Sequence, residues 1–239
     1  MTNSIPSPSP APRHAPDQRG TVAQKKHLAV NERLLAATFE VFSRAAAPSV
    51  DDVIRQAKVS RATFHKHFAS LDDAFSAVAL RLSAQLSAGF GPFLSTLDSP
   101  VERTCVGARL LLLRAAADPQ WAGFVQRAHV DPRDSDIYRL LAAHLAEGKA
   151  LGHFDYADLR TVTDLIMGVN LAAIRGIRDT GADELDSYID AACEFVLRAL
   201  AVPRVQRMNS TAFARNYVLV TTDGRNWWEA AVQDARQDA

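Results

Sequence analysis

The sequence predicts an all-α fold, in which an N-terminal three-helix head that contains a helix-turn-helix is followed by a larger helical body. Apolar residues recur at helical spacing from about residue 27 to residue 202, with short polar turns between the helices. Within the head, the stretch from Ser49 to Phe68 has the pattern of two short helices joined by a tight corner, which is the layout of a helix-turn-helix. The chain has 239 residues and is 48% hydrophobic, enough for one large domain or two small ones.

Composition argues against several other classes of protein. No run approaches about 18 apolar residues, so we expect no membrane-spanning helix. The N-terminus is rich in proline and serine and lacks the apolar stretch of a secretory signal, so we expect a disordered leader over residues 1–24. Cys105 and Cys193 both fall in apolar helical patterns, and we expect them to be reduced and buried, as in a cytoplasmic protein.

The net charge of the chain is zero, but it is unevenly distributed. Residues 1–68 hold ten Lys and Arg against five Asp and Glu, whereas residues 69–239 hold seventeen against twenty-two. A basic head on an acidic body fits a head that binds a polyanion, because neutralising phosphates supplies most non-specific affinity for DNA. Ordinary scatter is the other interpretation of so small an imbalance, and the charge pattern alone does not decide between the two.

The head begins with an amphipathic helix from about His27 to Ala46. Its apolar face carries Leu35, Phe39 and Phe42 at spacings of four and three. Proline at position 48 ends this helix, since proline disfavours helix in the residue before it.

Capping residues predict both helices of the motif. Ser49 is a good N-cap, and Asp52 stands three residues later, which is the spacing of a capping box. The helix that starts here can run for only about eight residues before the corner. Ser60 then caps the second helix, and the apolar pair Val59 and Phe64 has the spacing of a hydrophobic staple.

The two faces of this second helix differ in character. At 100° per residue, Phe64 and Phe68 define the inward face, and Ala62 and Lys66 point the opposite way. A small residue at the centre of the outward face lets the helix axis approach a partner closely. Arg61 lies in the first turn, where base contacts usually concentrate in such motifs. The alternative is that these residues form an ordinary solvated helix face.

Residues from about His27 to Leu86 resemble the DNA-binding domain of the tetracycline-repressor (TetR) family. The likeness rests on LLAATFEVF in the first helix, on SVDDVIRQAKVSRATFHKHF in the motif and on FASLDDAFSAV at the start of a long fourth helix. The family pattern V-S-x-x-T-[FIL]-Y-x-[HY]-F is kept at Val59, Ser60, Thr63, Phe64, His67 and Phe68. The resemblance implies a DNA-binding domain over residues 27–88 whose recognition helix meets bases and phosphates. The predicted DNA-binding residues are Ser49, Lys58, Ser60, Arg61, Ala62, Thr63, His65, Lys66 and His67.

Four residues depart from the family pattern. His65 replaces the usual tyrosine, and Ile54 fills a slot that alanine usually holds. Lys58 occupies the corner position where glycine is common, which costs about 1–2 kcal/mol if the backbone there is left-handed. Leu71 stands where a phosphate-contacting lysine is frequent, so we expect one phosphate contact to be lost. These departures motivate an alternative function, a helical protein–protein adaptor whose degenerate motif no longer binds DNA.

The fourth helix is predicted to run from Leu71 to about Phe90, where Gly91 and Pro92 end it. The body, residues 92–202, then holds helices over 100–117, from 119, and over 136–150, 158–179 and 182–202. The last two carry small residues that let helices approach closely. By resemblance they pair with their symmetry mates, so the protein is expected to be a homodimer; packing within one chain is the other interpretation.

The resemblance also implies a cavity between the body helices that binds a small-molecule effector of unknown identity. Its candidate lining mixes aromatic and polar side chains, as ligand pockets do. The same set describes a helical core equally well, and His144 in particular fits a core histidine. The candidate residues are Phe90, Phe93, Leu112, Trp121, Phe124, His144, Met167 and Asn170.

Residues 203–239 do not continue the helical pattern and form a C-terminal extension of unknown role. The stretch NYVLVTT, residues 216–222, is predicted as a strand, with a turn at Asp223 and Gly224. A short helix is predicted from Trp227 to Arg236. We expect the extension as a whole to be disordered or loosely packed on the body.

Patterns for catalysis and metal binding are missing from the sequence. It has no Gly-rich phosphate loop, no G-x-S-x-G elbow, no H-E-x-x-H and no cysteine pair with metal-ligand spacing, so we predict neither an enzyme nor a metal or cofactor site. We expect a sequence-specific transcriptional regulator, a repressor that a small effector releases. As a homodimer it would place two recognition helices in successive major grooves, about 34–36 Å apart, on a near-palindromic operator.

Overall fold

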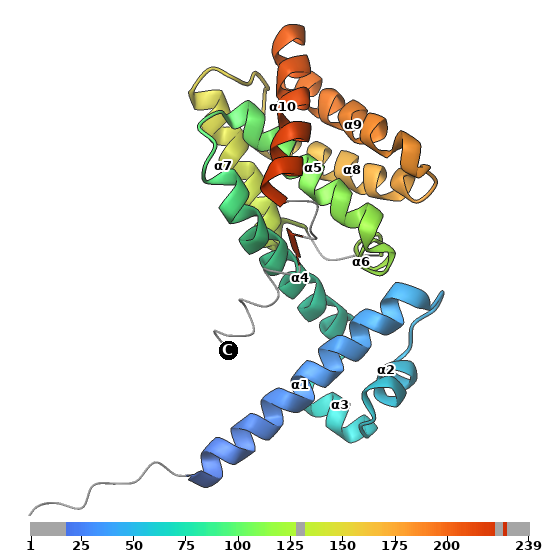
Figure 1. Cartoon of the computed structure of the whole chain (residues 1–239). Helices are drawn as coiled ribbons and strands as arrows, with labels where there is room; N and C mark the ends of the chain where they lie inside the picture. Colours follow the sequence, from blue (N-terminus) through green and yellow to red (C-terminus); the bar gives the residue numbers. More distant parts are fainter. Residues whose placement is uncertain (1–17, 128–131, 223–226, 229–239) are drawn as a thin grey trace, which may run out of the picture.

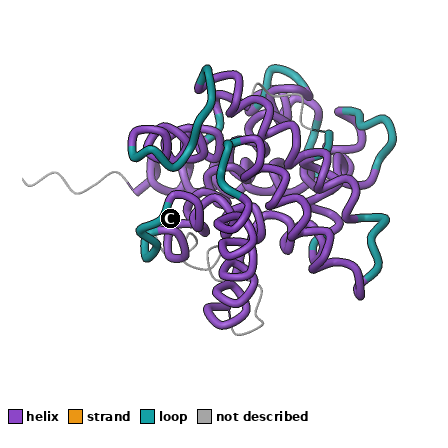
Figure 2. Tube along the Cα trace, turned by 90° about the horizontal axis from the view of Figure 1, so that it is seen from above, coloured by secondary structure: helices purple, strands orange, loops and turns teal. Residues whose placement is uncertain are grey.

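The computed structural model describes residues 18–127, 132–222 and 227–228, and within these ranges the chain is helical and has no strand (Figure 2). The all-α prediction is confirmed. None of the described helices combines the length and apolarity needed to cross a membrane. The helices are α1 (Gln18–Arg44), α2 (Val50–Ala57), α3 (Arg61–His67), α4 (Leu71–Leu94), α5 (Pro100–Ala117), α6 (Pro119–Val125), α7 (Asp136–Ala150), α8 (Leu159–Ile177), α9 (Leu185–Ala199) and α10 (Arg204–Thr222).

The helices form a small head and a larger body, and α4 runs from one into the other (Figure 1). In the head, α1 contacts α2 and α4, and its C-terminal half also meets α6 of the body. In the body, α5 contacts α4 and each helix from α6 to α10. The body core forms around α5, whose Val106, Leu110 and Leu112 are fully buried.

The predicted caps fix the two helices of the motif. The Ser49 hydroxyl accepts a hydrogen bond from the Asp52 amide (3.2 Å), and the Asp52 carboxylate accepts one from the Ser49 amide (3.2 Å), so the capping box is complete. The Ser60 hydroxyl accepts a hydrogen bond from the Thr63 amide (3.1 Å). Phe64 is fully buried in the head core, as the staple spacing predicts.

The corner of the motif is left-handed and is held from outside the motif. Lys58 has φ 53° and ψ 49°, a conformation that costs a non-glycine residue about 1–2 kcal/mol. The guanidinium of Arg33, on α1, donates hydrogen bonds to the carbonyls of Ala57 (2.5 Å) and Lys58 (3.0 Å). α1 therefore ties down the strained corner and the end of α2 together.

The predicted start of the first helix is wrong. α1 begins at Gln18, so residues 18–24, which were expected to belong to a disordered leader, are helical. No proline interrupts the chain between Pro16 and Pro48, and the helix extends back from the head without a break. Residues 1–17, the rest of the predicted leader, lie outside the described part of the chain.

The predicted end of the fourth helix is also wrong, because α4 continues through Pro92 to Leu94. Pro92 lies in the last turn of the helix, where it removes one backbone hydrogen bond to the residue four positions earlier. Phe90 and Leu94, on either side of it, are both buried in the body core. Their burial keeps the last turn helical.

The largest correction concerns the C-terminal extension. Residues 216–222, predicted as a strand, form the last turns of α10, which packs on α5 and α9 rather than loosely. The buried residues of α10, Ser210, Ala214 and Val218, lie four apart, so burial with helical spacing overrides the strand preference of the sequence. The predicted helix from Trp227 lies mostly outside the described residues.

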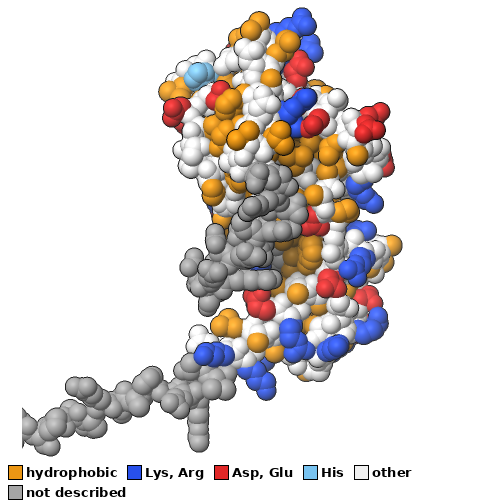
Figure 3. All heavy atoms as spheres, viewed as in Figure 1, with side chains coloured by type: hydrophobic (Ala, Val, Ile, Leu, Met, Phe, Trp, Pro, Cys, Tyr) orange, Lys and Arg blue, Asp and Glu red, His pale blue; other side chains and the backbone are white. Residues whose placement is uncertain are grey.

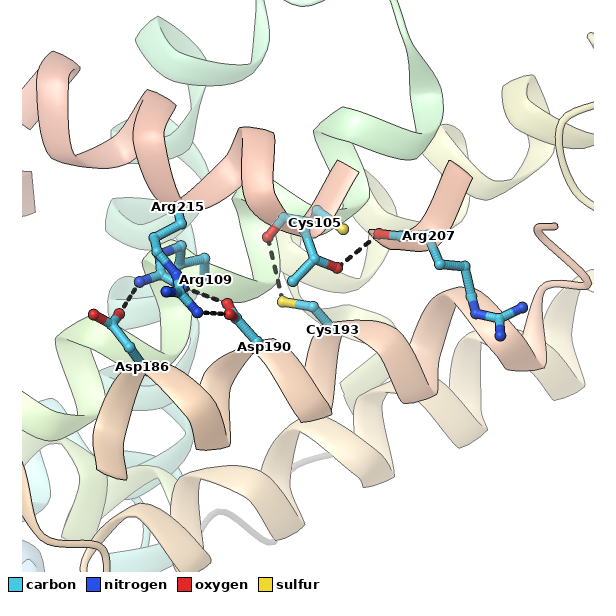
Figure 4. Close-up of polar contacts among 8 residues, drawn as sticks. Cys105, Arg109, Asp186, Asp190, Cys193, Arg207 and Arg215 are labelled. Carbon is cyan, nitrogen blue, oxygen red and sulfur yellow. Dashed lines mark hydrogen bonds and ion pairs between the residues drawn. The ribbon is translucent and has the colours of Figure 1, made fainter. Parts of the chain in front are cut away.

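Ion pairs seat α10 on the body (Figure 4). Arg109 of α5 is buried and pairs with two carboxylates of α9, those of Asp186 and Asp190 (2.9 Å to Asp190). Arg215 of α10 pairs with the other oxygen of Asp190. Asp190 therefore joins three helices.

The two cysteines meet beside these ion pairs (Figure 4). Cys105 and Cys193 are both buried and unpaired, as predicted, and the Cys193 thiol lies 3.7 Å from the Cys105 carbonyl oxygen. Contact with Cys105, together with burial, raises the pKa of the Cys193 thiol. The thiol therefore stays protonated at pH 7 and acts as a packing group of the core.

Candidate DNA-binding helix and effector cavity

α3 presents one face of the head to solvent. Thr63 and His67 are half-buried at the edges of this face, and Phe64 points away from it into the core. In the space-filling view, Lys and Arg side chains gather over the head (Figure 3). The residues that the helical spacing places outward are exposed, namely Arg61, Ala62, His65 and Lys66.

The remaining predicted contact residues lie at helix ends close to α3. Ser49 is half-buried in its capping box, and Lys58 is exposed at the corner. Ser60 lies at the start of α3, with its hydroxyl 2.8 Å from the hydroxyl of Thr63. The structure therefore gathers all nine predicted DNA-binding residues around one end of the head.

Arg61 is already engaged within the head. Its guanidinium forms an ion pair with Asp51 of α2 (2.5 Å), and both side chains are more than half exposed. A surface pair of this kind contributes about 0–1 kcal/mol, so Arg61 can exchange Asp51 for another partner at little cost. In the unbound protein, the ion pair orients the Arg61 side chain toward Asp51.

His67 is held against α1. Its ring stacks on that of His27, with 4.2 Å between the ring centroids. Burial lowers the pKa of His67, and the nearby His27 and Lys66 lower it further, so His67 is neutral at pH 7. His67 therefore packs the end of α3 on α1 and carries no charge toward a polyanion.

A cavity of about 240 Å³ lies in the body between helices α4, α5, α6, α7 and α8. Two predicted pocket residues do not line it: Phe93 packs against Trp227, and Leu112 is fully buried in the core elsewhere on α5. The other six predicted residues do line it, and these are Phe90, Trp121, Phe124, His144, Met167 and Asn170.

Few polar groups border this cavity. Arg103 of α5 forms an ion pair with Glu147 of α7 (2.6 Å). Burial lowers the pKa of His144, and the charge of Arg103 lowers it further, so this imidazole is neutral at pH 7. Two buried donors, the Nε of Arg103 and the Nε1 of Trp121, have no hydrogen-bond acceptor in the described part of the chain.

α6 connects the cavity to the head. Phe124 lines the cavity and also stacks on Phe75 of α4, with 4.7 Å between the ring centroids, and meets the edge of Phe42 of α1 at 6.3 Å. Beside it, Gly123 approaches α1 so closely that a Cβ would lie 3.1 Å from the Ser43 carbonyl oxygen. One wall of the cavity is therefore packed directly on α1, the helix whose Arg33 holds the corner of the motif.

α8 and α9 leave an apolar face uncovered by the described residues. Leu165 of α8 is 65% exposed and Phe195 of α9 is 59% exposed. On α8, Gly168 and Ala172 are also exposed and continue the stripe from Leu165 at spacings of three and four. This stripe gives a second helix room to approach the backbone of α8.

The same arrangement of helices occurs in solved structures of transcription regulators. The structure of RolR in complex with resorcinol matches with a TM-score of 0.63 and 20% sequence identity, over 79% of this chain and 95% of that one. A TetR-family transcription regulator from Shewanella sp. PV-4 matches with a TM-score of 0.63 and 18% sequence identity, over 72% of this chain and 97% of that one. FadR from Bacillus subtilis, in complex with stearoyl-CoA, matches with a TM-score of 0.57 and 16% sequence identity, over 70% of this chain and 98% of that one. No protein-family model and no curated protein matches the sequence itself.

The chain has the TetR fold. At these identities the likeness establishes the fold alone. It extends the resemblance seen in the head to the body, because the solved structures are matched over 95% or more of their own length.

Sequence reasoning missed four charged residues that shape this version of the TetR fold, namely Arg33, Asp51, Arg103 and Arg114. The guanidinium of Arg114 lies 4.7 Å from the ring centroid of Trp121, behind the cavity wall. Burial lowers the pKa of Arg114 to about 10, so it stays charged at pH 7. The available signal for Arg103 and Arg114 was an arginine on a helix that is otherwise apolar. Arg33 and Asp51 offered none, because no spacing rule links either to its partner.

Proposed function

We propose that the protein is a homodimeric transcription regulator, a repressor that binds a near-palindromic operator through α3 and leaves it when a small molecule enters the body cavity. α3 itself carries the proposal. It is capped at Ser60, anchored by the buried Phe64 and exposed along a face of small and basic side chains. Helix-turn-helix proteins place a helix of this kind in the major groove.

We assign a role in DNA binding to each side chain on the exposed face of α3. Ala62 lets the helix axis approach the base pairs closely. Arg61 exchanges Asp51 for a guanine edge, and Lys66 reaches a phosphate or a guanine. Thr63 donates to or accepts from a base edge at the flank of the helix. Leu71 packs partly buried against the head core and supplies no phosphate contact.

The uncovered face of α8 and α9 supports the homodimer. A second copy of the chain would bury Leu165 and Phe195, which are otherwise left in water. The small residues Gly168 and Ala172 allow the paired helices to pack closely. Two-fold symmetry would place two copies of α3 one helical turn of DNA apart, so the operator half-sites should be about 34–36 Å apart.

The contact between α6 and α1 supports effector control. A ligand in the cavity pushes on Phe124, which packs against Phe42 and Phe75 in the joint between head and body. A ligand that fits one position of α6 better than another shifts the population between two arrangements of the heads. DNA binding then falls because the two heads no longer match the spacing of the operator.

The size of the cavity narrows the choice of effector. Pockets for drug-sized ligands span about 300–1,000 Å³, and a cavity of about 240 Å³ lies just below this range. The RolR structure holds resorcinol and the FadR structure holds stearoyl-CoA. A compact molecule of the first kind fits the volume here, whereas a long acyl-CoA does not.

The residue assignment is tested by replacing Arg61 and Thr63 together with alanine. The operator is first selected from a random duplex library, and binding is measured by gel shift. Two lost base contacts should weaken specific binding at least about 30-fold while leaving non-specific binding at low salt nearly unchanged. Arg139→Ala, which removes an exposed arginine of α7, is the matched control and should bind as the wild type does. Undiminished discrimination by the double variant would refute the assignment.

A protein–protein adaptor is the second candidate, favoured by the Arg61–Asp51 pair and by the neutral, packed His67. Both features reduce the positive charge that α3 offers to DNA. A salt series separates the candidates. A DNA-binding protein should lose affinity steeply between about 50 and 200 mM salt. A complete lack of binding to any duplex at the lower salt concentration would favour the adaptor.

A further inference from the structure

The lining of the body cavity is apolar and contains no acidic side chain among the described residues. Leu86, Phe90, Leu111 and Leu140 are typical of its walls. Arg103 is the one cationic side chain among the lining residues that the structure describes, and His144 beside it is neutral. A cationic ligand would therefore find a like charge and no counter-ion at the cavity wall.

Some polar groups at the cavity have a hydrogen-bond partner within the protein, and others have none. The Thr104 hydroxyl donates to the Pro100 carbonyl (2.9 Å), and the Ser83 hydroxyl accepts from the Ile137 amide (3.0 Å). The unsatisfied groups are the Nε of Arg103 and the Nε1 of Trp121, and both can only donate. Buried donors without acceptors are costly, so the guanidinium of Arg103, which lines the cavity, favours a ligand group that accepts hydrogen bonds.

Arg103 forms an ion pair with one carboxylate, that of Glu147, and this ion pair can be broken. Glu147 pairs with it at 2.6 Å, but the Glu147 side chain is 44% exposed, whereas that of Arg103 is 15% exposed. A carboxylate that enters from the cavity can replace Glu147, which then returns to water at little cost. The arginine, in contrast, has no comparable route to solvent.

We propose that the effector is a compact, mostly apolar molecule with one anionic group, which Arg103 binds at the wall of the cavity. The apolar part fills the space between α4, α5 and α8. This inference rests on the proposed function, which makes the cavity the effector site.

Isothermal titration calorimetry on the full chain tests the charge preference with three probes of one shape. These are 1-naphthoate, the neutral 1-naphthamide and the cation 1-naphthylmethylammonium. Naphthoate should bind at least about tenfold more tightly than the amide, because a charge-assisted hydrogen bond replaces a neutral one. The ammonium probe should bind more weakly than either.

Variants locate the preference at Arg103. Arg103→Gln should bring the affinities for naphthoate and naphthamide within about twofold of each other, and Arg103→Lys should restore part of the difference. Arg139→Gln makes the same change at an exposed site on α7 and should keep the wild-type ratio. Circular dichroism establishes that each variant is folded.

Several outcomes would overturn this ligand class. They are equal or tighter binding of the amide, a preference that survives Arg103→Gln, and no naphthoate binding below about 1 mM. Gel shifts on the selected operator report separately on the proposed function. If the protein binds the operator and a neutral probe releases it, the ligand class is wrong and the effector site stands. If naphthoate binds through Arg103 and the protein binds no duplex, the site stands and the proposed regulation fails.

Discussion

The head and the body are both helical, and side-chain caps begin helices in both, but the two regions differ in the size of their cores and in buried charge. The head core is small, and Phe64 is the one aromatic side chain fully buried in it. Its helices are held at their ends, by the caps at Ser49, Ser60 and Ser70 and by Arg33 at the corner. The body has a continuous core around α5 and joins its helices through buried charge. The head, which is proposed to bind DNA, is therefore the less stable of the two regions, since a small core contributes little stability.

The two regions meet in a cluster of their own. Leu35 and Phe42 of α1, Phe75 and Val78 of α4 and Phe124 of α6 bury one another there. The cluster belongs to neither of the two main cores. Head and body can therefore be destabilised separately or disconnected at the cluster, and the effects should differ in size.

Removal of the head's aromatic anchor should have the largest effect. Phe64→Ala leaves a cavity in a core that has little else to fill it and should cost about 3–5 kcal/mol. The head should unfold at room temperature and operator binding should disappear. The body should remain folded, as retained binding of 1-naphthoate and one remaining melting transition would show. Loss of both regions together would contradict the separation of head from body.

Removal of the buried arginine tests the body in the same way. Arg109→Ala removes a buried arginine that bonds two carboxylates, but Asp186 can return to water and Asp190 keeps Arg215, so the body should be destabilised by about 1–3 kcal/mol. Urea denaturation measures the change in the free energy of unfolding. Arg139→Ala, which breaks an exposed pair with Asp136, should change it by less than about 0.5 kcal/mol. Equal effects of the two substitutions would mean that the Arg109 pairs do not hold α5 and α9 together.

Disconnection at the joint should cost less but alter the link between the regions. Phe124→Leu keeps an apolar side chain and removes the aromatic contacts with Phe75 and Phe42, at about 1–2 kcal/mol. Calorimetry should then resolve two transitions that overlap in the wild type. In gel shifts, more naphthoate should be needed to release the operator. An unchanged release curve would exclude α6 as the connection.

Substitution of glycine for the non-glycine residues with positive φ should have the smallest effect on stability. Lys58 in the head and Ala201 in the body both have positive φ, of 53° and 60°. Lys58→Gly and Ala201→Gly should each stabilise their own region by about 0.5–1 kcal/mol, because relief of strain exceeds the added entropy of the unfolded chain. The head transition should rise in the first variant and the body transition in the second. Gly152→Ala, at φ 76°, should have the opposite sign.

The parts of the fold that could be predicted from sequence depend on neighbours in the chain. The Ser49 and Ser60 caps and the Val59–Phe64 staple are patterns within five residues, so a linear reading finds them. α10 was mispredicted because β-branched residues in NYVLVTT favour a strand, and contact with α5 and α9 decided otherwise. An apolar stripe also does not reveal which of its residues border a void. Leu112 and Phe124 looked alike in sequence, and only the second lines the cavity.

The head can fold before the body during synthesis, because Arg215 lies late in the chain. During synthesis the head core is complete once Ala74 has left the ribosome, and N-terminal domains generally fold first. The Arg109–Asp190–Arg215 network closes about 140 residues later, with α10. A nascent chain therefore carries a folded head long before α8 and α9 can present a finished surface to a second copy. Under the proposed function, single heads on growing chains would bind DNA weakly and without symmetry until α10 has packed on α5 and α9.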